Sequence, residues 1–229
     1  MKTVGLVGGT GWVSTIDYYR YMNQLVFEKT AQQSTAKVLV HSVNYPPIAA
    51  LTAANKWDEI AIIISNAAKG LVTAGADCIL LCANTMHHIA PHVAGTIDVP
   101  LIHIAEVTAK AIQEQTINKV ALLGTKYTMN LPFFKDILFE MGIETLVPDE
   151  EDRILINDSI YKELSLGIVT DATKNMYATI IEKMTAKGAA GIIAGCTEIP
   201  MVVQQSDFDI PIFDTTYLHA QAAVKFALS

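Results

Sequence analysis

Cys196 is the residue whose type and position point most directly to chemistry. It follows the apolar run at residues 191–194 and precedes residues 197–200, Thr-Glu-Ile-Pro, an order typical of a strand that leads into a helix. The positive end of a helix dipole lowers the pKa of a thiol, so we expect Cys196 to be a reactive thiolate. Cys78 and Cys82 lie inside a predicted strand, where a cysteine is usually a buried, inert side chain.

The Cys196 turn has a counterpart earlier in the chain. Three segments of the first half recur in the same order in the second half: residues 75–85 at 188–198, residues 2–8 at 118–124, and residues 99–102 at 210–213. The offsets are 113, 116 and 111 residues, and the first of them places Ala83 opposite Cys196. We infer two α/β halves with the same order of strands and turns.

The elements that must position these turns follow from hydrophobic periodicity. Short β-branched runs alternate with amphipathic stretches, which is typical of βα units and a parallel sheet. Ser14, with Asp17 three residues later, predicts a capping box for a helix that runs through Lys29. Strands are expected at residues 3–7, 37–43, 78–82, 101–104, 120–123, 191–194 and 212–214. Further helices are expected to start near residues 57, 130 and 170 and to end at the left-handed glycine caps Gly75, Gly142 and Gly188.

The turns at residues 83–85 and 196–198 form the candidate site. Ligands of open α/β folds bind at the carboxyl edge of the sheet, where both turns are expected. Asn84 and Thr85 offer short donors at the first turn, or simply cap a helix. If the two halves face each other, the two turns approach one small molecule from opposite sides. That arrangement suits chemistry that needs one group on each face of a carbon atom.

The loop after the first strand, residues 8–11, is rich in glycine. A dinucleotide fingerprint read from its second glycine would place Ser14 where the last glycine belongs, and no carboxylate for a ribose follows at the right distance. We therefore expect a tight strand-to-helix turn whose N–H groups, together with Thr10, could bind a carboxylate. The matching loop of the second half carries Thr125 and Tyr127, whose hydroxyls either hold a carboxylate or cap a turn.

Composition excludes several classes of protein. With 229 residues, 51% apolar and 17% charged, the chain is long and apolar enough to form one large domain or two small ones. Its formal charge of −7 provides no basic surface for nucleic acid. No apolar run approaches the length of a membrane span, and the first residues lack a leader pattern. We expect a cytoplasmic protein with free thiols and with no nucleic-acid or membrane partner.

Other catalytic patterns are lacking in the sequence. It contains no G-x-S-x-G elbow and no Walker lysine, which argues against hydrolase and kinase chemistry. His88 and His92 are four residues apart on a possible helix, next to His87, but no third ligand or H-E-x-x-H context accompanies them. We expect these histidines to pack or to be solvated, and we expect no metal.

A set of specific motifs runs from end to end of the chain: Val7-Gly8-Gly9 with Trp12 and Ser14-Thr15, His41-Ser42-Val43, Asn84-Thr85-Met86-His87, Gly124-Thr125-Lys126-Tyr127-Thr128, Gly195-Cys196-Thr197-Glu198 and Phe213-Asp214-Thr215. In combination they resemble the aspartate/glutamate racemase superfamily, and specifically its cofactor-independent amino-acid racemase branch of broad specificity.

The resemblance implies an α/β architecture of two flavodoxin-like parallel-sheet domains, related by pseudo-twofold symmetry, with the active site between them. We place the first domain at residues 1–97 and 209–229 and the second at residues 98–208. The closing strand from Pro211 would return to the first domain. The resemblance further implies a homodimer that acts on a small amino-acid substrate and needs no pyridoxal or other cofactor.

Catalysis in this family uses two opposed residues. One removes the α-proton as a thiolate, and the other delivers a proton to the opposite face. Carried over to this chain, Cys196 is the second of these residues. The α-carboxylate would be bound by Asn84, Thr85 and Thr197, with help from Thr125, Tyr127 and the Thr10 loop.

The first base is missing, because Ala83 stands where relatives have Cys or, in a broad-specificity subgroup, Thr. Alanine cannot exchange a proton, and the adjacent Cys82 would point to the opposite side of its strand. We therefore expect a racemase with a disabled first base, inactive or impaired. One alternative is a one-thiol decarboxylase similar to the arylmalonate decarboxylases. Another is an amino-acid-binding relative that has lost catalysis.

The lack of basic residues in two segments indicates the substrate preference. Aspartate-specific members carry basic groups after the loop at residues 45–47 and in the segment that aligns with residues 167–170. Here residues 48–50 are Ile-Ala-Ala, and residues 168–170 are Ile-Val-Thr. An acidic side chain would lack a charge-assisted partner, so we expect a broad or neutral amino-acid specificity.

Overall fold

The computed structural model describes residues 1–31 and 33–229, which divide into two compact units. Unit 1 comprises residues 1–104 and 219–229, and unit 2 comprises residues 105–218. Each unit is built on its own parallel sheet, so the α/β class and the expected pair of parallel sheets are confirmed. No helix among these described residues is long and apolar enough to span a membrane.

The sheet of unit 1 has the order β2-β1-β3. Its strands are β1 (Val4–Gly8), β2 (Val38–Ser42) and β3 (Cys78–Leu81). Side chains of β3 alternate between two cores, as the twofold repeat of a strand requires. The helices that cover unit 1 are α1 (Trp12–Lys29), α2 (Tyr45–Ala53), α3 (Trp57–Thr73), the 3-10 helix η1 (Asn84–Ile89), α4 (Ala90–Ala94) and the later part of α10 (Thr215–Leu228).

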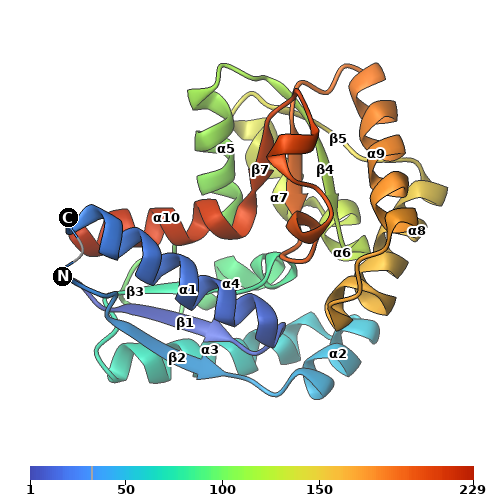
Figure 1. The fold of residues 1–229 in the computed structure, drawn as a ribbon. Coiled ribbons are helices and arrows are strands. Elements are labelled where there is room, and N and C mark those ends of the chain that lie inside the picture. Colours follow the sequence, from blue (N-terminus) through green and yellow to red (C-terminus); the bar gives the residue numbers. More distant parts are fainter. Residues whose placement is uncertain (32) are drawn as a thin grey trace. The chain divides into compact units, whose positions relative to one another are not determined.

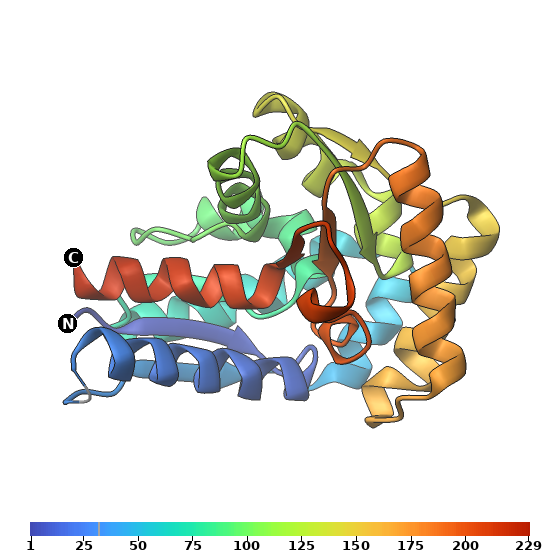
Figure 2. The same ribbon diagram turned by 45° about the horizontal axis from the view of Figure 1, so that its top comes forward.

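The two faces of this sheet are covered by different helices. Figures 1 and 2 show α1 and α10 side by side on one face and α3 on the other. Residues of α1 and α10, including Tyr18, Met22 and Ala223, form one buried core with Leu6 and Leu80. The other core is formed by α3, η1 and α4 against the opposite face.

The sheet of unit 2 has the order β5-β4-β6-β7. Its strands are β4 (Lys119–Gly124), β5 (Glu144–Leu146), β6 (Ile192–Gly195) and β7 (Ile212–Asp214). The helices that follow and cover them are α5 (Ile104–Glu114), α6 (Lys126–Asn130), α7 (Pro132–Glu140), α8 (Glu150–Lys162), α9 (Asp171–Ala186), and the 3-10 helices η2 (Leu164–Leu166), η3 (Ile199–Met201) and η4 (Gln205–Asp207).

The strand registers of the two units confirm the internal repeat. Gly5, Leu6 and Val7 pair with Ile79, Leu80 and Leu81 in unit 1. Their equivalents pair in the same register in unit 2: Ala121 with Ile192, Leu122 with Ile193, and Leu123 with Ala194. The third repeat segment agrees as well, because the bridge from Ile79 to Leu101 corresponds to the pair of Ile192 with Ile212.

The same comparison corrects our expectation for the end of the chain. The strand from Pro211 does not return to the first domain, because β7 pairs with β6 in unit 2 and thereby completes the repeat. The return is made by α10, whose residues from His219 onward belong to unit 1. The division therefore lies at residues 104 and 218 rather than at 97 and 208, and the strand expected at 101–104 is a single bridge at Leu101.

Most helix ends follow the sequence signals. Gly75, Gly142 and Gly188 have φ angles of +98°, +77° and +92°, so the expected left-handed caps are confirmed. The helix expected from residue 130 is interrupted at Leu131, which is extended because Pro132 follows it and starts α7. The short edge strand β5 was missed.

Candidate active site

The first strand of unit 1 ends in a tight turn. Gly9 has a φ of +87°, and a Cβ there would lie 2.2 Å from the carbonyl oxygen of Val43, so only glycine fits. The Gly9 N–H donates to Oγ1 of Thr15 over 3.0 Å. This is the strand-to-helix turn that the sequence predicts. It leaves Thr10 half-buried, with its Oγ1 unpaired among the described residues.

Ser14 does not cap α1, contrary to the capping-box prediction. The N-cap residue is Gly11, and no side-chain cap is formed. Instead, the Ser14 hydroxyl donates to the backbone carbonyl of Cys82 over 2.7 Å and is buried there. Ser14 thus ties the start of α1 to the end of β3, and a side chain committed to that carbonyl cannot also accept the helix N–H groups.

The turn after β3 holds the first group of predicted site residues. Ala83 is the N-cap of η1, extended at φ −155° and ψ 137°, and it is half-buried. Asn84 is buried and Thr85 half-buried. The Cys82 N–H donates to the carbonyl of Val7 over 2.9 Å, so this turn and the Thr10 loop lie at the carboxyl ends of neighbouring strands.

Cys82 cannot take the place of the first base that the family resemblance implies at residue 83. Its side chain is fully buried in the core beneath α1 and α10, whereas Ala83 packs at the edge of the core on the opposite face of the sheet. Burial also raises the pKa of Cys82 strongly and that of Cys78 to about 12. Both thiols are therefore inert at neutral pH.

The matching loop of unit 2 begins at Gly124 and Thr125. A Cβ on Gly124 would lie 3.0 Å from the carbonyl oxygen of Gly195, which shows how closely the ends of β4 and β6 approach. Thr125 is buried and is the N-cap of α6, where its Oγ1 accepts the Thr128 N–H over 3.4 Å. Tyr127 lies in the first turn of α6 and is half-buried.

Cys196 follows β6 and is paired with a carboxylate that the sequence analysis did not assign a role. Its Sγ lies 2.9 Å from Oε2 of Glu198, and Oγ1 of Thr197 donates to the same oxygen over 2.8 Å. A carboxylate only accepts, so the thiol is the donor. The arrangement holds Cys196 as a protonated thiol beside a base.

This geometry overturns the expectation of a lowered thiol pKa. Burial of Cys196, followed by the negative charge and hydrogen bond of Glu198, raises its pKa well above the ordinary value. The helix that was expected to stabilise a thiolate is η3, which has only 3 residues. So short a helix supplies little dipole, and a carboxylate at 2.9 Å outweighs it.

His87 and His88 of η1 pack against other side chains. His87 is fully buried, and His88 packs edge-on against the Trp57 ring with centroids 4.6 Å apart. Within the described parts of the chain, no group of three or more His, Cys, Asp or Glu side chains converges to hold an ion.

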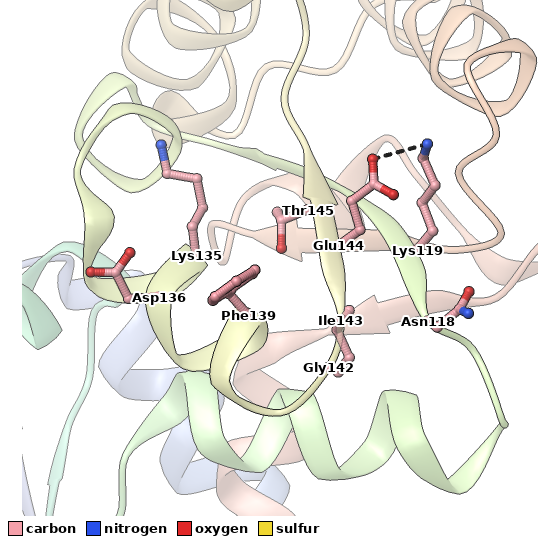
Figure 3. A pocket seen from close by; sticks show the side chains of 9 residues that line it. All are labelled: Asn118, Lys119, Lys135, Asp136, Phe139, Gly142, Ile143, Glu144 and Thr145. Atoms are coloured by element: carbon pink, nitrogen blue, oxygen red, sulfur yellow. Dashed lines mark ion pairs between the residues drawn. The ribbon is translucent and has the colours of Figure 1, made fainter.

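A surface hollow of about 740 Å³ lies at a different edge of unit 2 (Figure 3). Asn118 and Lys119 enter it at the start of β4, and Glu144 at the start of β5, with a 3.0 Å ion pair between Lys119 and Glu144. Ligands of such sheets bind at the carboxyl ends of the strands. The hollow therefore lies at the wrong end of the sheet to be the catalytic site.

Comparison with known proteins agrees with the motifs. The sequence profile described as Asp/Glu/hydantoin racemase matches residues 7–223. A crystal structure from Yersinia pestis, assigned provisionally to the Asp/Glu racemases, is 44% identical with a TM-score of 0.95, and each chain is covered completely. An aspartate racemase homologue from Pyrococcus horikoshii is 32% identical with a TM-score of 0.89, again over both whole chains. The broad specificity amino-acid racemase RacX of Bacillus subtilis is 26% identical over 172 residues, which are 75% of this chain and 74% of RacX.

Proposed function

The chain belongs to the Asp/Glu/hydantoin racemase family, and we propose that it exchanges the α-proton of an amino acid, without a cofactor, on one face of the substrate. The observation that carries this proposal is the contact of 2.9 Å between the Cys196 thiol and the Glu198 carboxylate at the carboxyl end of β6. A thiol paired with a base is what a proton-transfer step at carbon requires.

The proposed step moves one proton at a time. The Cys196 thiol first gives its proton to the Glu198 carboxylate, which leaves a thiolate beside a neutral carboxylic acid. The thiolate then removes the α-proton of the substrate, and the electron pair of the C–H bond remains on the α-carbon. Reversal of both transfers returns a proton to the same face.

Donors around the substrate carboxylate would stabilise this carbanion. In our proposal these are Asn84 and Thr85 at the end of β3 and Thr197 beside Cys196, assisted by Thr125, Tyr127 and the Thr10 loop. Asn84, Thr85 and the Thr10 loop belong to unit 1. Thr125, Tyr127 and Thr197 belong to unit 2. We propose that the substrate binds at these turns.

Residue 83 limits the reaction to one face. Racemisation needs a second proton donor opposite Cys196, and the Ala83 side chain has no ionisable group. We therefore propose that this chain exchanges the α-proton with solvent but racemises its substrate poorly. The similarity to RacX and the apolar side chains at residues 48–50 and 168–169 support a broad or neutral substrate range.

Exchange in deuterated water tests the proposal. Each enantiomer of a panel of neutral amino acids is incubated with the protein, and loss of the α-proton signal is followed by NMR while chiral chromatography follows inversion. We expect exchange of one enantiomer without inversion, and its loss in Cys196→Ser. Equally rapid interconversion of both enantiomers by the Ala83 protein would reject the two-base assignment, and no exchange at all would reject the proposed exchange of amino-acid protons.

A one-thiol decarboxylase is the second candidate, and the pairing of Cys196 with Glu198 favours it specifically. A thiol that rests protonated can deliver a proton to one face of a carbanion formed by loss of CO₂, and that reaction needs no group at residue 83. A disubstituted malonate would then be consumed, with CO₂ released, whereas amino acids would exchange no proton. A binding protein without catalysis would bind amino acids, and Cys196→Ser would change no reaction.

We also propose a homodimer in the cytoplasm. The free cysteines, Cys78, Cys82 and Cys196, fit a reducing compartment. The outer face of α1 exposes Trp12, Ile16, Tyr19 and Phe27 by 68%, 53%, 55% and 44%. These side chains expose about 450 Å² of apolar surface, roughly half of what one partner buries in a standard interface. A second copy of this chain is the occupant that we propose for this face.

A further inference from the structure

A buried group of histidines in unit 1 has no part in the proton transfers proposed above. The His87 ring packs edge-on against His103 and His219, with centroids 4.7 Å and 5.4 Å away. His87 and His219 are fully buried. Burial lowers the pKa of His219 to about 3, that of His103 to about 4, and that of His87 well below its ordinary value. All three rings are therefore neutral at physiological pH, and each keeps a single ring N–H.

The hydrogen bonds fix which ring nitrogen carries the proton. Nε2 of His219 lies 2.7 Å from the carbonyl oxygen of Ile102, and a carbonyl only accepts, so Nε2 is protonated and Nδ1 accepts from the Tyr18 hydroxyl over 2.7 Å. By the same argument, Nδ1 of His87 is protonated and donates to the Ala83 carbonyl over 3.0 Å. Nε2 of His87 is then a lone pair, buried and without a partner among the described residues.

The bond from His87 ends on the backbone of the residue that stands in place of the first base. In a trans peptide, the C=O of one residue and the N–H of the next point in opposite directions. Holding the Ala83 carbonyl against His87 therefore turns the Asn84 N–H away from the histidines. The His87 ring also interacts with the backbone of Asn84, and His103 interacts with the backbone of His87.

We propose that His87 is a positioning residue, which clamps the carbonyl of residue 83 and so aims the backbone donors of the 83–85 turn at the substrate carboxylate. This inference rests on the proposed function, because the carboxylate is that of the amino acid. A neutral, buried imidazole suits the task, since it supplies one donor in a fixed direction and adds no charge that would compete for the substrate.

Replacement of His87 by Leu and by Asn separates positioning from packing. Leu removes the donor, whereas Asn keeps an N–H near the position of Nδ1. The readout is the preference of the protein for neutral amino acids over their C-terminal amides, measured by calorimetry. We expect His87→Leu to lower this preference about tenfold, equivalent to about 1.4 kcal/mol, and His87→Asn to restore most of it.

His88→Leu is the matched control, because His88 lies in the same 3-10 helix and packs on Trp57 instead of bonding to the turn. A purely structural role would weaken binding of acid and amide alike. An unchanged preference in His87→Leu, or an equal loss in His88→Leu, would overturn the inference while the proposed function stands. A wild-type protein that binds no amino acid would overturn both.

The wild-type protein provides an independent test that needs no variant. Nitrogen-15 NMR of the histidine rings should show His87 as the neutral tautomer protonated at Nδ1, and saturation with amino acid should leave that tautomer unchanged. Protonation at Nε2, or a charged ring at neutral pH, would overturn the clamp.

Discussion

Restoring an ionisable side chain at residue 83 is the most direct test of the two-sided reaction. Ala83 lies at φ −155°, an extended conformation that any residue adopts, and it is half-buried. Ala83→Cys and Ala83→Thr add one or two heavy atoms and need no change of backbone. We expect both variants to fold with an unchanged unfolding midpoint and to gain racemisation.

The expected increase in racemisation rate follows from the contribution of one general acid–base group. A positioned general acid–base group contributes about 10² to 10⁴ in rate, equivalent to about 3 to 5 kcal/mol of barrier. In the proposed reaction Cys196, paired with Glu198, supplies one such group, and the second is expected from residue 83. Racemisation, followed by chiral chromatography, should therefore rise by about 10² or more, whereas exchange by Cys196 alone changes little.

Ala83→Val is the matched control, because valine has the shape of threonine without the hydroxyl. If Val increased racemisation as much as Thr, filling of space rather than proton transfer would be responsible. If wild-type protein already inverted its substrate as fast as Ala83→Cys, residue 83 would have no role in the second proton transfer, and the reasoning from the repeat would fail.

Three further outcomes are expected. Glu198→Gln removes the negative charge beside Cys196 and should lower the pKa of the thiol, so the pH profile of its alkylation by iodoacetamide moves to lower pH; a profile that stays in place would contradict the pairing. Gly9→Ala should destabilise the protein by about 2 kcal/mol or more in urea unfolding, because it combines a positive φ with a backbone clash. Tyr19→Glu should shift the molecular mass in light scattering toward the monomer, whereas Phe139→Glu, at an 80% exposed side chain in unit 2, should not.

Much of the fold could be predicted from the sequence because the internal repeat shows the pattern of each repeated strand in two places. A strand that is ambiguous alone becomes clear when its equivalent 111 to 116 residues away shows the same pattern. The registers of Leu6 with Leu80 and of Leu122 with Ile193 follow from it. Taken strictly, the repeat also predicts that β7 stays in unit 2, as the bridge at Leu101 does in unit 1. The pairing of β7 with β6 therefore follows the repeat and not the expectation from the family resemblance.

The local electrostatics could not be predicted in the same way. Whether Cys196 meets the end of a helix or a carboxylate depends on the conformation of a few residues after the strand. The sequence contained the signal, a glutamate two residues after the cysteine, but a side chain at that spacing can point toward or away from the thiol. The predicted capping role of Ser14 was wrong for a related reason. Its hydroxyl donates to a carbonyl 68 positions away in the sequence and does not accept from the adjacent helix N–H groups.

The two halves share a framework and differ in how each turn is held. At the repeat offset of 113, Glu198 corresponds to Thr85 and His87 to Pro200, so neither the carboxylate nor the histidine is duplicated. In unit 2 a carboxylate holds the thiol itself, whereas in unit 1 a neutral imidazole holds the backbone carbonyl of residue 83. A hydrogen bond to the backbone carbonyl of residue 83 does not depend on which side chain that residue carries. In the roles proposed above, alanine at residue 83 removes the first base but leaves the conformation of the turn unchanged. We therefore expect substrate binding and racemisation to separate in this protein.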